Sequence, residues 1–382
     1  MGITHAFTNP KSDGADTTVV RPSDWNAEHV VSGISSLYLD TLPVGATYGD
    51  EFDEASLNAR WTPTGVLKAT NGQYAVSGTW LVLKFPTTST GSIFQAAPAT
   101  DTLEVIAAFS THAIGNMIGP AIVSSTGTGV YAAIRTDNAR FVIANTTAYA
   151  HTGDGVARVI TTGDSVLGGG KVWISLRKFA TALDGDIYFA RYSQDGCTWS
   201  WTVKYNPSDF TVAKIGFGRM GSNNGVSNDR TAIDRFVVVG LDVGNNLVRT
   251  PTSGTPTYTA SSAGGGAAAN AADGTSSSWA ASTGATDNPL YWQVAWSVGQ
   301  TLNRVIIKDR NSGGGLFGLA HLELNDGATT TYVALDDLLD NTEAWYLAEF
   351  PTLTGITSLR VVSDSAAANS CGLIEVEAYL AS

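Results

Sequence analysis

The sequence predicts a mainly β protein, with two jelly-roll β-sandwiches in tandem behind an extended N-terminal arm. Apolar and polar residues alternate with the two-residue period of a strand, whereas helical periodicity is nearly absent between Tyr48 and Gly244. Turn-forming residues recur between these short runs. Charged residues make up 15% of the chain and Gly occurs 41 times. This composition suits short strands joined by many turns.

The first thirty residues form the predicted arm and show neither a helix nor a strand period. Pro10, Gly14 and Pro22 interrupt the segment, while Ser23 can cap a one-turn helix after Pro22. Trp25 is the single large apolar anchor. Such a segment is either disordered or docked onto a partner, and the anchor favours docking over a tail with an incidental Trp.

The motifs of this segment resemble a known family. Thr4-His5 is followed by Lys11-Ser12-Asp13-Gly14 and then by Val20-Arg21-Pro22-Ser23-Asp24-Trp25-Asn26. This order resembles the N-terminal segment of tailed-bacteriophage virion proteins of the tail and fibre type. The resemblance implies a structural protein that is assembled in the host cytoplasm and docks on other virion proteins, of the capsid or tail, through residues 1–30. The docking residues that it implies are Arg21, Pro22, Asp24, Trp25 and Asn26.

The first sandwich is predicted over residues 48–244, after an arm and connector that together span 1–47. Alternation places Val172, Ile174 and Leu176 on one face of a strand. Residues 130–135 and 140–144 flank a four-residue loop and predict a hairpin. The turn residues Leu-Asp-Gly-Asp at 183–186 indicate a turn in place of a metal loop.

Two motifs of this sandwich resemble concanavalin-like and laminin-G-like domains. One is the opening segment 50–61, in which Phe52 and Trp61 would fill the core, and the other is the hairpin 192–199 with an Asp-Gly turn. The opening segment also holds four carboxylates, Asp50, Glu51, Asp53 and Glu54. Paired carboxylates can hydrolyse glycosidic bonds. Because the Glu-Asp-Glu run of the glucanases of this fold is absent, solvated edge charge is the preferred interpretation.

The second sandwich is predicted over residues 245–382, after a boundary rich in Asn, Thr, Ser, Pro and Gly. Strand alternation occurs at 304–308, 321–324, 359–362 and 374–380, and a helical turn is expected at 336–340. Four ordered motifs, at 272–279, 291–294, 304–310 and 372–379, resemble discoidin (coagulation factor type C) domains. These domains overlap with carbohydrate-binding modules of the galactose-binding-like fold.

This resemblance implies a structural calcium ion and a glycan site. The calcium ligands would be Asp273 and Glu375, with a hydroxyl from Ser277 or Ser278, although the loop before Trp279 is one residue shorter than usual. The alternative at Asp273 is a hydrogen-bonded turn.

The glycan site would lie in loops at one end of the sandwich. Its candidate residues are Asn311, Ser312, Phe317 and His321. The alternatives are a Phe317 that caps the core and a His321 that is an ordinary strand residue. Trp279, Trp292 and Trp345 are predicted to lie in the core.

Charge and motif content exclude several functions. The net charge is −12 and no Lys/Arg run supplies a positive field, so neither nucleic acid nor anionic membranes are expected partners. No apolar run is long enough for membrane insertion, and the start lacks a secretory signal. Cys197 and Cys371 lie in different predicted domains, which predicts two buried thiols. No nucleophile elbow or His/Cys metal spacing is present, so an enzyme is not expected.

The expected function is therefore that of a virion fibre or adhesion protein that displays carbohydrate-binding sandwiches to host surface glycans. A homo-oligomer, with a trimer favoured, is expected because trimers are usual for phage fibres and multivalent display strengthens weak sugar binding. Two alternatives remain open. One is a purely architectural head or tail decoration protein, and the other is a polysaccharide depolymerase that uses the first sandwich.

Overall fold

The computed structural model describes the strands of two sandwiches and some of the turns between them. The described residues are 2–3, 29–30, 48–67, 74–77, 80–85, 90–100, 102–111, 116–135, 140–159, 171–181, 183–194, 199–205, 210–222, 229–240, 245–261, 266–276, 278–280, 290–310, 320–335, 345–363 and 372–380. The chain divides into two compact units, Met1–Gly45 and Ala46–Ser382. The predicted docking residues 21–26, the helical turn at 336–340 and both cysteines lie outside the described residues.

The first unit is described only at two short strands. Strand β1 (Gly2–Ile3) pairs antiparallel with β2 (His29–Val30), so that Gly2 lies opposite Val30. The sequence predicts no strand in this segment, because two-residue strands leave no alternation to detect. The pairing brings the start and the end of the predicted docking segment side by side.

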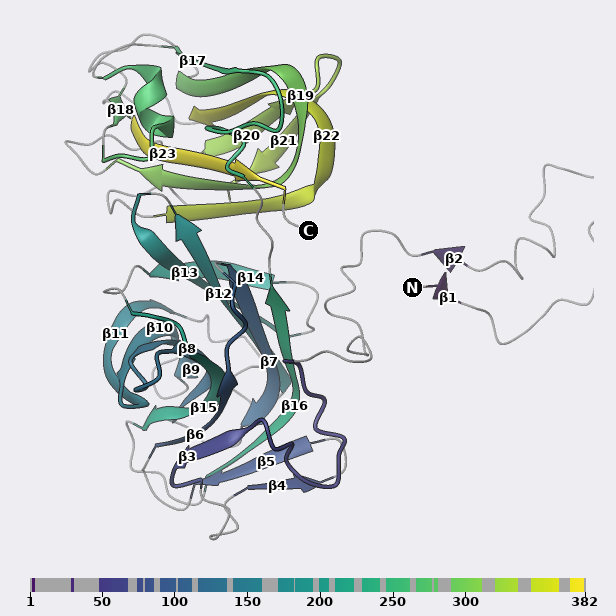
Figure 1. The fold of residues 1–382 in the computed structure, drawn as a ribbon, viewed down its shortest axis with the longest axis vertical. Coiled ribbons are helices and arrows are strands. Elements are labelled where there is room, and N and C mark those ends of the chain that lie inside the picture. Colours follow the sequence, from purple (N-terminus) through teal and green to yellow (C-terminus); the bar gives the residue numbers. More distant parts are fainter. Residues whose placement is uncertain are drawn as a thin grey trace, which may run out of the picture. The chain divides into compact units, whose positions relative to one another are not determined.

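The first sandwich consists of two seven-stranded antiparallel sheets (Figure 1). The first sheet has the order β11 (Ala150–Val159), β10 (Arg140–Thr147), β9 (Gly129–Arg135), β8 (Asn116–Val123), β15 (Lys214–Ser222), β6 (Gly91–Ala96) and β3 (Thr62–Gly65). The second sheet has the order β14 (Trp199–Tyr205), β13 (Gly185–Ser193), β12 (Lys171–Thr181), β7 (Leu103–Thr111), β16 (Asp229–Gly240), β5 (Trp80–Phe85) and β4 (Tyr74–Ser77).

The strand and hairpin predictions for this sandwich are confirmed, whereas the prediction of solvated charge is wrong for Asp50, which is buried. Strands β9 and β10 form the predicted hairpin with Arg135 opposite Arg140, and β13 and β14 form the second one. Phe52 and Trp61 are buried in the core between the sheets, together with the three alternating apolar residues of β12. The turn before β13 is also present, with Gly185 at a φ of 66°. The Asp-Gly turn at 195–196 lies outside the described residues.

The second sandwich is built on two long strands, each of which takes part in both layers. These strands are β19 (Leu290–Asp309) and β22 (Trp345–Ser363). The sheet order is β18 (Trp279–Ala280), β23 (Gly372–Tyr379), β19, β22, β20 (Ala320–Asn325) and β21 (Thr330–Ala334), and β17 (Pro256–Ala260) pairs with β19. A short 3-10 helix, η4 (Ala268–Ala272), precedes β18.

The predicted strands 304–308, 321–324 and 359–362 lie within β19, β20 and β22. The bounds of the predicted strand 374–380 lie within two residues of those of β23. Trp292 and Trp345 are buried as predicted, and the side chain of Trp279 is not described.

The two sandwiches pack on each other through one face of each. Phe179, Ile187 and Phe189 of the first form a buried apolar cluster with Ile306, Trp345 and Tyr379 of the second. This contact buries Phe179 on the outer face of β12 and Tyr379 on that of β23. Most residues of both strands are buried, so neither strand shows a polar, exposed face along its whole length.

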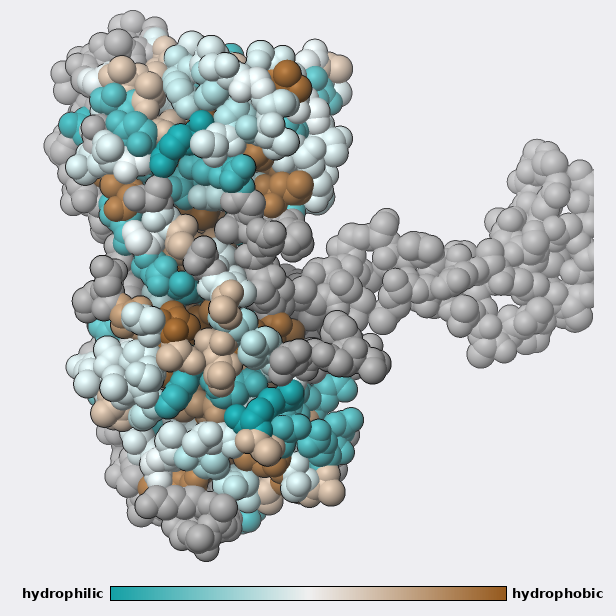
Figure 2. Space-filling model, viewed as in Figure 1, coloured by the Kyte–Doolittle hydropathy of each residue, from teal (hydrophilic) through white to brown (hydrophobic). Residues whose placement is uncertain are grey.

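The surface of the described residues is mixed in polarity. On the face shown in Figure 2, hydrophobic residues form only small patches among hydrophilic and neutral ones. The described part of the chain also has no helix with the length and apolarity of a membrane span.

Candidate functional site

His321 is the predicted glycan-site residue that the structure describes, and it lies on the outer face of β20. Its neighbours Leu322 and Leu324 belong to the core, so His321 and Glu323 point to the opposite side. Asn311, Ser312 and Phe317 lie outside the described residues. The candidate site is therefore built around His321.

Cross-strand pairing aligns five outward side chains across this sheet. Tyr332 lies opposite Glu323, Glu323 opposite Arg360, Arg360 opposite Gln293, and Gln293 opposite Thr259. We call these five residues the polar row. It crosses β21, β20, β22, β19 and β17 in that order.

Arg360 is the centre of the polar row. Its guanidinium donates a hydrogen bond to the side-chain oxygen of Gln293 and lies 3.4 Å from Glu323. The same group lies over the ring of Tyr291, 4.6 Å from the ring centroid. A planar cation held from three sides keeps its remaining N–H donors in a defined position.

His321 and Tyr332 form the exposed end of the site. The His321 ring lies 3.6 Å from a Glu323 oxygen and 5.7 Å from the Tyr332 ring centroid. Tyr332 is 66% exposed. Among the described residues of this face, its ring is the aromatic surface most accessible to a ligand.

The chemistry of the polar row matches that of a sugar. Sugar hydroxyls both donate and accept hydrogen bonds, while the C–H face of the ring stacks on aromatic side chains. Arg360 supplies donors, Glu323 supplies acceptors, and Gln293 supplies both.

The sequence predicts one residue of this face, His321, as a site residue and does not point to the others. The outward positions of recognisable strands hold Arg360, Glu323 and Gln293. The alternation of inward and outward residues within each strand was the available signal. The pairing that aligns them joins residues 37 and 67 positions apart. Alternation within one strand says nothing about such register.

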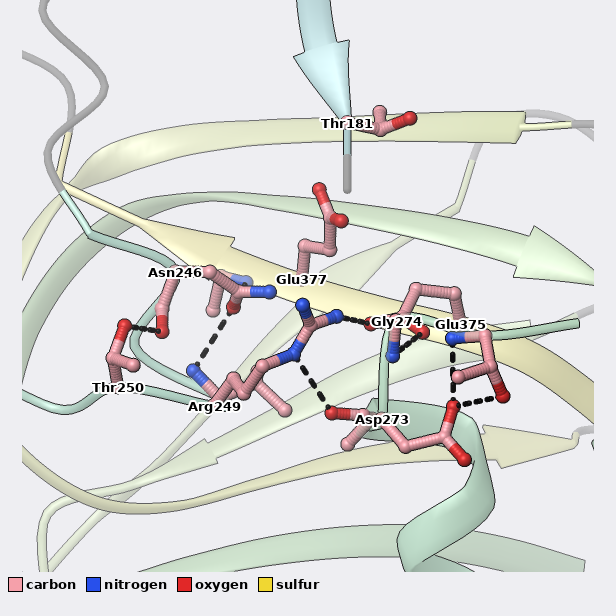
Figure 3. A network of polar contacts seen from close by, with 12 residues as sticks. Thr181, Asn246, Arg249, Thr250, Asp273, Gly274, Glu375 and Glu377 are labelled. Atoms are coloured by element: carbon pink, nitrogen blue, oxygen red, sulfur yellow. Dashed lines mark hydrogen bonds and ion pairs between the residues drawn. The ribbon is translucent and has the colours of Figure 1, made fainter. Parts of the chain in front are cut away.

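The predicted calcium ligands have other partners (Figure 3). Asp273 accepts hydrogen bonds from the backbone N–H of Thr275 at 2.8 Å and from its hydroxyl at 2.7 Å. Glu375 is buried, accepts the Gly274 N–H at 2.9 Å and pairs with Arg249 at 2.7 Å. Burial and the neighbouring Glu377 raise the pKa of Glu375 to about 7, against the lowering effect of Gly274 and Arg249.

With the Arg249 guanidinium in place, these residues do not fit a calcium ion. Two oxygens of the kind that calcium takes, from Glu375 and from the Ala272 carbonyl, already accept hydrogen bonds from Arg249. The described residues also hold no group of three or more His, Cys, Asp or Glu side chains that could bind a metal. Ser277 lies outside the described residues, and the Ser278 carbonyl accepts from Asn270. The Arg249 guanidinium already supplies positive charge at Glu375.

The four carboxylates at the start of the first sandwich have separate roles. Asp50 is buried and accepts hydrogen bonds from the Trp61 indole at 2.6 Å and from Arg60 at 2.9 Å. Glu51 lies 3.5 Å from Arg235. Glu54 accepts from Asn58, and Asp53 is exposed. Asp50 therefore holds the core Trp in place.

Comparison with known proteins finds neighbours among solved structures only. No family model matches the chain, and no curated protein does. A family 32 carbohydrate-binding module from C. perfringens in complex with galactose is 18% identical, with a TM-score of 0.30 over 32% of this chain and 93% of that one. A Streptococcus pneumoniae fucose binding module is 19% identical, with a TM-score of 0.29 over 36% and 98%.

A longer stretch of the chain is similar to a glycoside hydrolase family 43 protein from Bacillus licheniformis. This protein is 12% identical, with a TM-score of 0.39 over 53% of this chain and 41% of that one. Several of the neighbours are thus carbohydrate-binding β-sandwich modules. At these scores the likeness assigns neither a ligand nor an activity to this chain.

Proposed function

We propose that this chain is a non-enzymatic, glycan-binding attachment protein of a bacteriophage particle. The C-terminal sandwich would bind host surface sugars through the polar row and the adjoining residues His321 and Tyr291. The observation that carries the proposal is the alignment of an exposed aromatic ring, an arginine, a carboxylate and an amide across neighbouring strands of one outer face.

The virion part of the proposal is supported by the motifs of residues 1–30. Their resemblance to phage tail and fibre proteins motivates docking on capsid or tail proteins through Arg21, Pro22, Asp24, Trp25 and Asn26. The proposal includes a homo-oligomer, for which a trimer is the expected form, because several copies on one particle would bind host glycans together.

Binding to a glycan array and to host cells tests the sugar site. We expect the full chain to bind, and Tyr332→Ala and Arg360→Ala to lose about fivefold or more in affinity, since each removes a stacking or hydrogen-bonding group worth about 1 kcal/mol or more. Val298→Ala is the control, because Val298 is exposed but lies in the bend of β19, away from the row.

These binding measurements, together with an assay for reducing-end release, separate the alternatives. A full chain that binds no glycan and no host cell would favour an architectural decoration protein. Unchanged binding by Tyr332→Ala and Arg360→Ala would show that the sugar binds outside the polar row. Release of reducing ends from host polysaccharide would make the chain a depolymerase.

Deletion of residues 2–30 tests the docking segment. We expect the truncated chain to keep the circular dichroism and melting behaviour of the sandwiches but to be absent from purified particles. Copurification of the truncated chain with virions would contradict docking through this segment.

A further inference from the structure

A short turn at the entrance of the second sandwich places one arginine beside the buried Glu375. The Asn246 backbone oxygen accepts hydrogen bonds from the N–H groups of Arg249 and Thr250, at 3.1 and 2.7 Å. The Asn246 side chain accepts from Ala378 N–H at 3.2 Å, which ties the turn to β23. The backbone around Arg249 is thus anchored on the strand that carries Glu375.

The guanidinium of Arg249 bridges two oxygen atoms that come from different elements. It donates to the backbone carbonyl of Ala272, at the end of η4, at 3.1 Å, and to Glu375 at 2.7 Å. The second Glu375 oxygen accepts the Gly274 N–H at 2.9 Å. Figure 3 shows this closed set of contacts around the labelled Arg249, Gly274 and Glu375.

Gly274 leaves the space that the guanidinium fills. A Cβ atom at this position would lie 2.4 Å from an Arg249 terminal nitrogen, and the Gly274 φ of +73° also disfavours other residues. The loop after η4 therefore passes directly against the guanidinium, and the positive φ favours Gly at this position.

We propose that Arg249 is a built-in cation that takes the place of a metal ion between this loop and β23, so that the C-terminal sandwich folds without calcium. A carboxylate and a backbone carbonyl are the oxygen ligands that a hard cation would take. A guanidinium reaches both at once through its planar fork of donors and stays charged at every physiological pH. Unlike a bound ion, it cannot dissociate when the free calcium concentration falls.

Thermal melting of the full chain in EDTA and in calcium chloride tests the proposal. The wild-type melting temperature should be the same in both. Arg249→Ala should melt about 5 °C or more lower in EDTA, because it leaves a buried carboxylate without its cation. Calcium chloride should restore part of this loss, since the vacated space offers the ion the Ala272 and Glu375 oxygens.

Arg360→Ala is the matched control, because it removes an arginine from the same sandwich but from its outer face. It should show no response to calcium. A wild-type chain that calcium stabilises would overturn the proposal, as would an Arg249→Ala chain that melts like the wild type. An Arg249→Ala chain that is destabilised but insensitive to calcium would reduce the contact to an ordinary ion pair and overturn it too.

If Arg249→Ala does not fold in either buffer, the melting of Arg249→Lys in the same two buffers tests the proposal. A lysine keeps the charge but not the fork, so this variant should be less stable than the wild type and insensitive to calcium. Stabilisation of Arg249→Lys by calcium would contradict the proposal. Glycan binding plays no part in these measurements, so their outcome is independent of the proposed function.

Discussion

At the scale of single residues, buried carboxylates organise both sandwiches. Asp50 accepts hydrogen bonds from the Trp61 indole, the Arg60 side chain and the Phe52 backbone, and Phe52 has a φ of 53°. Such a positive φ is costly for a large side chain and persists only where the surroundings hold it. Asp50 thus fixes the two aromatic residues that fill the first core.

We predict that Asp50→Ala lowers the free energy of unfolding by about 2 to 4 kcal/mol, because it leaves the buried indole and Phe52 N–H donors without an acceptor. Urea denaturation measures this change. Asp53→Ala is the control, since Asp53 lies in the same acidic run but is exposed, and it should change stability by less than about 0.5 kcal/mol. An Asp50→Ala chain that is as stable as Asp53→Ala and the wild type would contradict a structural role of Asp50.

At the scale of elements, β19 and β22 build the second sandwich by taking part in both of its layers. The pairing of the two strands changes register between Ala295 and Gln300 and again before Arg304. Their backbones come close there, and a Cβ on Gly299 would lie 2.8 Å from the backbone of Gly355. The bend places the polar row on one layer and Arg304 and Lys308 on the other.

We predict that Gly299→Ala destabilises the sandwich by about 1 to 3 kcal/mol, because backbone atoms cannot yield to an added methyl group as a flexible side chain can. Thermal melting checks this value. Thr354→Ala, an exposed change at the same bend, should have no measurable effect. An unchanged melting temperature of Gly299→Ala would show that the two strands accommodate the added methyl group without strain.

At the scale of the whole molecule, ion pairs surround the apolar contact between the sandwiches. Glu349 of the second sandwich pairs with Arg177 and Arg191 of the first and with Arg304 of its own. Lys308 and the Trp345 indole both donate to Asp184, the residue of the predicted turn. Burial alone would raise the pKa of Glu349, but the three guanidinium groups hold it well below its ordinary value of 4.5.

This pKa shift predicts loss of stability in acid. A carboxyl group whose pKa is lower in the folded than in the unfolded state stabilises the fold above its unfolded pKa, and that contribution is lost as the pH falls. We expect the urea midpoint to fall as the pH drops below about 4.5.

Glu349→Gln tests the source of this acid sensitivity. It should lower the midpoint at neutral pH and flatten its acid limb. An acid limb as steep in Glu349→Gln as in the wild type would assign the pH dependence to other groups, such as the buried Glu104, whose pKa its arginine partners lower in the same direction.

The sequence by itself determined the class of fold and the local elements. Period-two alternation placed Val172, Ile174 and Leu176 in the core, and turn residues located the hairpins around 136–139 and 195–198, because both signals depend on neighbouring positions only.

Tertiary structure decided the contacts that carry the site and its stability. The partner of Glu375 is an arginine 126 positions away, and Glu349 meets Arg177 across 172 positions. Neither pairing leaves a local pattern. They depend on strand register and on how two sandwich faces meet, and these follow from the packing of the whole chain.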